Sequence, residues 1–93
     1  MADTITIDLR RMLEDLSKRE PERRLQFIVS LHPDASAAGV AAVGMTIDDD
    51  IAAPRLLLGR MTPEQALAAA RLDTVERIEC DSGGVKALGG FKA

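Results

Sequence analysis

Apolar residues recur every three or four positions near the start of the chain, which is the spacing of one helix face. They are Ile5, Leu9, Met12, Leu13 and Leu16, and charged side chains occupy most of the positions between them. We therefore predict a helix over about residues 7–19, capped by Thr6 or Asp8 and ended before Pro21. Its apolar stripe must pack on the rest of the domain, on a second copy or on a partner.

Alternation of apolar and polar residues then predicts a strand over residues 24–31. One face of this strand would hold Leu25, Phe27, Val29 and Leu31. Ile28 interrupts the otherwise polar second face, which favours a central strand covered in part on both sides. Pro33 pushes His32 away from helical geometry, so His32 is expected in the turn that ends the strand.

The middle of the chain predicts a short helix and two further strands. Residues 35–43 are rich in alanine and predict the helix, and residues 43–47 predict the second strand. Asp48, Asp49 and Asp50 form a run of like charges, which we expect in a solvated loop. Residues 55–61 predict the third strand, with Leu56 and Leu58 on one face and Leu57 on the other.

The best-specified element is a helix that starts after Thr62. Thr62 is a favourable N-cap, Pro63 suits the first helical position, and Glu64 suits the positive end of the helix. Gln65 completes a capping box with Thr62. A fourth strand follows over residues 75–81, with one face formed by Ile78 and Cys80 and the other by Arg77, Glu79 and Asp81.

The order of these elements predicts an α+β domain. Strand, helix, strand, strand, helix and strand follow the N-terminal helix, which is the βαββαβ pattern of a ferredoxin-like domain. We expect an antiparallel sheet with two helices on one face and an open second face suited to docking. The chain would divide into an amphipathic helical extension over residues 1–22, the domain over residues 23–88 and a flexible tail over residues 89–93.

Composition and charge narrow the class of partner. Ninety-three residues suit one domain, and an aromatic content of 2% without Trp or Tyr offers no platform for stacking nucleic-acid bases. The net charge is −3. All of this net negative charge comes from residues 25–93, which carry six basic and nine acidic side chains. An acidic domain favours a protein partner over nucleic acid.

No apolar run resembles a signal peptide or a membrane span, so we expect a cytoplasmic protein that binds no membrane.

Residues able to carry chemistry are few and scattered. His32 is the single histidine, and a metal site usually needs several ligands. Cys80 is the single cysteine, for which the role of a small buried apolar residue is expected. The run of three aspartates lacks the ligand spacing and central glycine of a calcium loop, and no nucleophile elbow or phosphate loop is present. We expect no enzyme, no catalytic residue, no cofactor and no metal site.

Glu79 and Asp81 are the most informative polar pair, because they lie two residues apart on one face of a strand. Such a pair is usually a solvated acidic surface. Two exposed carboxylates can also bind the positive ends of helices on a partner protein, where backbone N–H groups are unpaired. The residues alone leave both interpretations open.

The second half of the chain resembles the subtilisin-propeptide and proteinase-inhibitor family. In that family a glycine-bearing strand leads into T/S-P-E-x, then a helix, then V-x-x-V/I-E-x-D. The matching positions here are Gly59, Thr62, Pro63, Glu64, Val75, Ile78, Glu79 and Asp81. The segment of residues 27–31, F-I-V-S-L, is similar to the opening strand of the family, and the resemblance covers about residues 25–88.

The resemblance implies a specific mode of action. A ferredoxin-like sheet would dock on two parallel surface helices of a subtilisin-like serine protease, and Glu79 and Asp81 would cap these helices. The following segment would lie in the protease cleft, with Leu88 in the primary specificity pocket; its residues are Val85, Lys86, Ala87 and Leu88. Because no protease domain follows in this chain, we expect a standalone inhibitor or a folding helper that acts in trans.

Two other classes of function stay open at this point. The chain could be a structural or regulatory protein that shares the βαββαβ layout and dimerises through its N-terminal helix. A regulatory domain that binds a small ligand is the third class, and no pocket is visible in a sequence.

Overall fold

The computed structural model describes residues 4–81, which form three helices and four strands. In chain order they are α1 (Ile7–Arg19), β1 (Leu25–Leu31), α2 (Ala38–Val43), β2 (Thr46–Ile51), β3 (Leu56–Met61), α3 (Pro63–Ala69) and β4 (Val75–Cys80). The predicted α+β class is confirmed, as are the helix over residues 7–19 and the helix after Thr62.

The four strands form one antiparallel sheet in the order β2-β3-β1-β4, so β1 is central as its sequence predicts. Ile28 of β1 lies opposite Leu58 of β3 on one side and opposite Glu79 of β4 on the other. Phe27 and Val29, which flank Ile28, are buried on the other face of the sheet. Alternation along β1 therefore separates a core face from an open face.

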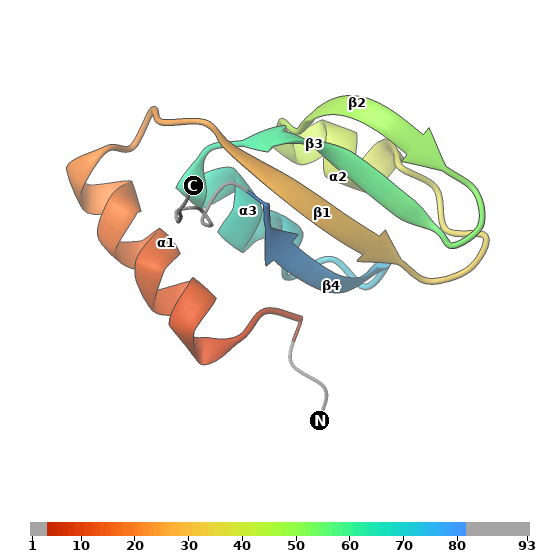
Figure 1. The fold of residues 1–93 in the computed structure, drawn as a ribbon, viewed down its shortest axis with the longest axis horizontal. Helices are drawn as coiled ribbons and strands as arrows, with labels where there is room; N and C mark the ends of the chain where they lie inside the picture. Colours follow the sequence, from red (N-terminus) through yellow and green to blue (C-terminus); the bar gives the residue numbers. More distant parts are fainter. Residues whose placement is uncertain (1–3, 82–93) are drawn as a thin grey trace, which may run out of the picture.

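Helices α2 and α3 lie behind the sheet in the view of Figure 1, and the opposite face of the sheet carries no helix across it. Helix α1 lies at one end of the molecule and contacts α3. The core fills the space between the sheet and these helices. Its fully buried members include Leu13, Phe27, Val29, Val40, Leu57, Met61 and Ile78.

Helix α1 is part of this core. The hydroxyl of Thr6 accepts a hydrogen bond from the backbone N–H of Leu9 at 3.1 Å, so Thr6 rather than Asp8 is the N-cap of the two predicted candidates. Leu13 and Leu16 are buried in the same cluster as Phe27. The apolar stripe of α1 thus packs on its own domain. The division into an extension, a domain and a tail stays a prediction, since residues 82–93 lie outside the described part of the chain.

The prediction for β2 was wrong at both ends. The strand begins at Thr46 because Gly44 ends α2 in the left-handed region, with φ of 115°. It continues through Asp48, Asp49 and Asp50, which were expected in a loop.

Two arginines explain how β2 tolerates its acidic run. Arg55 bonds to Asp50, and Arg60 lies 3.4 Å from Asp48. The strand pairing shifts between Ile47 and Asp49, as at a β-bulge. Charges and a bulge are common on edge strands because they discourage pairing with other chains.

The predicted capping box of α3 is present in full. The Thr62 hydroxyl accepts from the Gln65 N–H at 3.2 Å, and the Gln65 side chain accepts from the Thr62 N–H at 2.9 Å. Ala66 and Ala69 are completely buried. Their small side chains allow α3 to lie close to the sheet, where it contacts β3.

Candidate functional site

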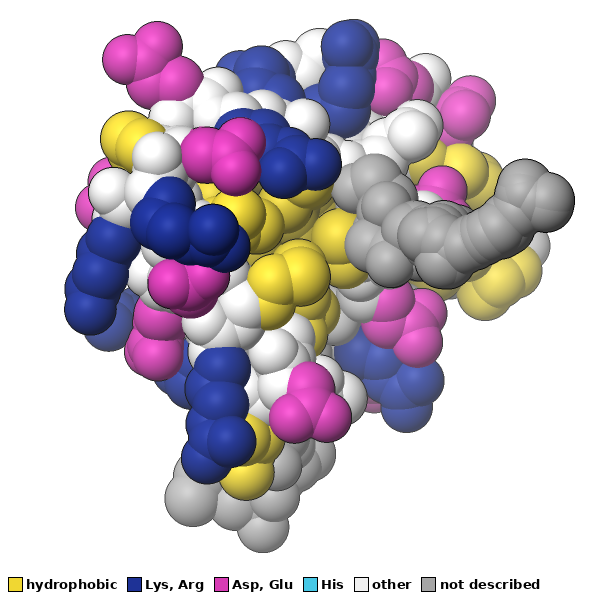
Figure 2. All heavy atoms as spheres, turned by 60° about the vertical axis from the view of Figure 1, so that its left-hand side comes forward, with side chains coloured by type: hydrophobic (Ala, Val, Ile, Leu, Met, Phe, Trp, Pro, Cys, Tyr) yellow, Lys and Arg dark blue, Asp and Glu magenta, His cyan; other side chains and the backbone are white. Residues whose placement is uncertain are grey.

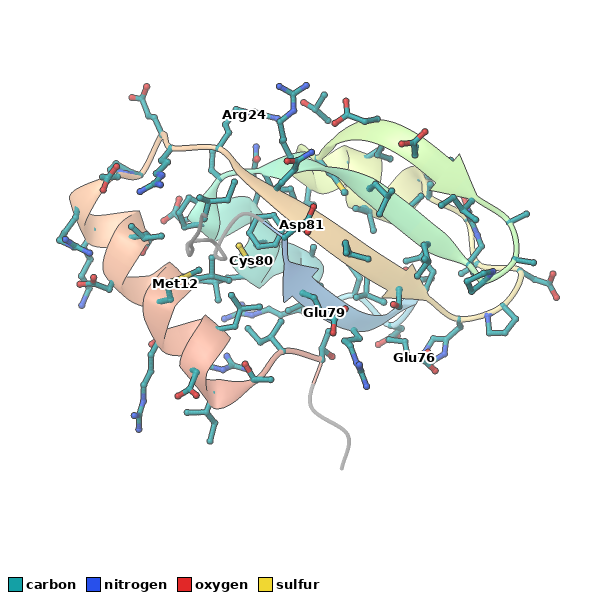
Figure 3. All side chains as sticks on the ribbon, in the orientation of Figure 1. Met12, Arg24, Glu76, Glu79, Cys80 and Asp81 are labelled. Carbon is teal, nitrogen blue, oxygen red and sulfur yellow. The ribbon has the colours of Figure 1, made fainter. Side chains whose placement is uncertain are left out.

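Glu79 and Asp81 lie at the end of β4, and both side chains are exposed on the face of the sheet that no helix covers (Figure 3). Ile78, between Arg77 and Glu79, points into the core and is 1% exposed. The Asp81 N–H donates to the carbonyl oxygen of Gln26 at 2.7 Å. The sheet therefore holds the backbone of both acidic residues in place.

The charge of Glu79 is partly balanced by a neighbour on its own strand. One guanidinium nitrogen of Arg77 lies 3.5 Å from a carboxylate oxygen of Glu79. Both side chains are more than half exposed, so the pair contributes little to stability. Glu79 can therefore exchange Arg77 for a group on another protein at a small cost in free energy.

An apolar centre adjoins the acidic pair on the open face. Ile28, Leu56 and Leu58 are half-buried there, because each is covered only by its neighbours in the sheet. One row across the sheet runs Asp49, Leu58, Ile28 and Glu79, and the next runs Ile51, Leu56, Ser30 and Arg77. An apolar centre between charged edges is the usual anatomy of a surface that binds proteins.

The four predicted tail residues lie outside the described residues. Val85, Lys86, Ala87 and Leu88 all fall in residues 82–93. Their predicted role at a protease cleft stays a prediction. Of the predicted site residues, Glu79 and Asp81 lie within the described part of the chain, two positions apart at the end of β4.

A groove between α1 and β4 is a feature that sequence reasoning missed. It has a volume of about 310 Å³ and is lined mainly by Leu9, Met12, Ile78 and Cys80, with Thr6, Asp8 and Glu79 around them. Figure 3 shows Met12 of α1 and Cys80 of β4 pointing toward the same space. In Figure 2, hydrophobic side chains gather on the side of the molecule that carries α1, between charged ones. Leu9 and Met12 are only half-buried, which would have indicated the groove. Their burial depends on the surface against which α1 packs, so the sequence alone does not reveal it.

A second hollow, of about 430 Å³, lies at the opposite end of β1, with Ser30, Leu56 and Glu76 among its lining residues. Arg55 borders it, but its guanidinium group is held by Asp50 and by the carbonyl oxygens of Ala35 and Ile51. These bonds fix the β2–β3 connection to the loop after β1. They give Arg55 a structural role.

The residues considered for chemistry are dispersed. His32 is exposed in the turn after β1, with Nδ1 3.6 Å from a Glu76 carboxylate oxygen. Cys80 is half-buried against the core rather than fully buried. Within residues 4–81, no three His, Cys, Asp or Glu side chains are grouped so that they could hold a metal ion. No helix of this same range has the length and hydropathy needed to cross a membrane.

No family model, no curated protein and no solved structure matches the chain.

Proposed function

We propose that this protein is a non-catalytic binding module that docks the open face of its sheet on a protein partner. The observation that carries the proposal is the position of Glu79 and Asp81, both exposed beside the apolar centre at the end of β4. Ile28, Leu56 and Leu58 would supply the buried part of the interface. The two carboxylates would fix its orientation.

The sequence resemblance supplies the class of partner, a subtilisin-like serine protease. The strand order β2-β3-β1-β4, with α2 and α3 following β1 and β3, supports the ferredoxin-like arrangement of that family. On this proposal the protein inhibits the protease or assists its folding. Glu79 and Asp81 accept hydrogen bonds from unpaired N–H groups at two helix ends, each contact contributing about 0.3–1 kcal/mol at an exposed site.

An inhibition assay tests the proposal. The purified protein is added to a subtilisin-type protease, and hydrolysis of a chromogenic peptide is followed. The double substitution Glu79→Gln with Asp81→Asn keeps side-chain shape and removes both charges. We expect inhibition to weaken by roughly 3- to 30-fold, which corresponds to the loss of two helix-end contacts.

A matched control separates the site from the overall charge. Glu22→Gln with Asp73→Asn removes the same charge from two exposed positions away from the open face. This control should inhibit like the unmodified protein. If the control and the site variant lose inhibition equally, or if micromolar protein inhibits no subtilisin-type protease, the proposal fails.

A further inference from the structure

The groove between α1 and β4 is an apolar surface beside the proposed docking face, and Glu79 is the one residue that both share. Leu9 and Met12 form its α1 side, and both are only half-buried although they lie on the stripe that buries Leu13 and Leu16. Ile78 and Cys80 form its β4 side. Apolar side chains that cover such a groove remove its apolar surface from water, which stabilises the folded protein.

The described part of the chain ends beside this groove. Cys80 lines it, and residues 82–93 begin two positions later. A segment of this length, at about 3.3 Å per extended residue, is long enough to turn back along β4. Gly83 and Gly84 stand at its start, and adjacent glycines permit a sharp reversal at little steric cost.

The composition of residues 82–93 complements the groove. The segment carries the large apolar residues Val85, Leu88 and Phe91, spaced three apart. Its charged side chains are Lys86 and Lys92, and it contains no Asp or Glu. The charged residues that line the groove are the acidic Asp8 and Glu79, of which Glu79 also lies 3.5 Å from the Arg77 guanidinium. The segment therefore offers apolar groups to an apolar lining and positive charge to a negative rim.

We propose that residues 82–93 of the same chain occupy the groove between α1 and β4 when the protein is alone. Apolar side chains of the segment cover Leu9, Met12 and Cys80, and its lysines lie near Asp8 and Glu79. This proposal is independent of the protease partner, because it concerns the isolated protein.

The single cysteine provides a built-in reporter of groove occupancy. The rate at which Cys80 reacts with iodoacetamide is measured in the full-length protein and in Val85→Ser/Leu88→Ser/Phe91→Ser. If the segment covers the groove ~90% of the time and protects the thiol while bound, the triple variant should react about tenfold faster. The control Ala87→Ser/Ala93→Ser adds hydroxyl groups to the same segment and keeps its large apolar residues, so its rate should stay unchanged.

A second measurement keeps the test independent of thiol chemistry. The methyl resonance of Met12, assigned by NMR, should shift in the triple variant and stay in place in the control. Lys86→Glu/Lys92→Glu should also raise the Cys80 rate, because it puts negative charge against Asp8 and Glu79. Thermal unfolding of each variant checks that the domain is intact.

Two results would overturn the proposal. Equal Cys80 rates together with an unchanged Met12 methyl resonance would show that the segment does not cover the groove, which would leave it for a peptide of another protein. Protection that increases with protein concentration would show that a second copy supplies the segment.

Discussion

The backbone N–H of Ile78 donates a hydrogen bond to the carbonyl oxygen of Thr4, with nitrogen and oxygen 2.8 Å apart. This bond joins the segment before α1 to the outer edge of β4, the strand that carries Glu79. Ile5, the next residue, is 3% exposed and belongs to the core cluster. The N-terminal region therefore covers part of an edge strand and helps to hold the proposed binding strand in place.

Leu13→Ala should destabilise the protein by about 2–5 kcal/mol, because Leu13 is fully buried and its removal leaves a cavity. Urea denaturation followed by circular dichroism measures the loss. Ile7→Ala is the control, since Ile7 on the same helix is 63% exposed, and it should change stability by less than about 0.5 kcal/mol.

Deletion of residues 1–22 tests whether the protein self-associates through α1. If deletion of residues 1–22 turned a dimer into a monomer of unchanged stability, the helix would serve association rather than the core. We expect the deletion to destabilise the domain instead, because it removes Ile5, Leu13 and Leu16 from the core cluster.

Gly59→Ala should disrupt the pairing of β2 with β3. A Cβ atom at Gly59 would overlap the backbone carbonyl oxygen of Thr46, which cannot move aside as a flexible side chain can. We expect a loss of about 1–3 kcal/mol in the free energy of unfolding, as for other overpacked sites.

Gly39→Ala in α2 is the matched control for this substitution. Its Cβ would meet only the Leu72 side chain, at 3.5 Å, which is an ordinary contact. Because alanine favours a helix, this change should stabilise the protein by about 0.5–1 kcal/mol. If the two substitutions had the same effect in denaturant titrations, the proposed close approach of β2 and β3 would be wrong.

Thr62→Ala should cost about 1 kcal/mol, because it leaves the Gln65 N–H at the start of α3 without its cap. Thr62→Ser keeps the hydroxyl and should retain most of the stability. Thermal unfolding of the two variants compares them directly. Equal midpoints for Ala and Ser would mean that the hydroxyl of residue 62 contributes nothing to the helix.

Features of this fold that depend on neighbours in sequence were predictable. The capping box of Thr62 and Gln65 involves residues three apart, and the exposure of Glu79 and Asp81 follows from alternation along β4. The path of β2 through Asp48, Asp49 and Asp50 was not predictable, because Arg55 and Arg60 offset that charge from beyond the strand.

The groove between α1 and β4 was not predictable from the sequence either. It forms because the bond between Thr4 and Ile78 and the burial of Leu13 and Leu16 fix the angle at which α1 meets β4. These contacts join residues far apart in sequence. The spacing of apolar residues along α1 predicts the helix but not the surface on which it packs.

Mapping the contact surface by NMR locates the face that binds the protease without any substitution. The ¹⁵N-labelled protein is titrated with a subtilisin-type protease whose active site is blocked, and backbone amide signals are followed. We expect the amide signals of Ile28, Leu58 and Glu79 to shift or broaden together, while those on the outer surfaces of α2 and α3 stay unchanged. Changes confined to those helices, or no change at micromolar protease, would contradict the proposed docking.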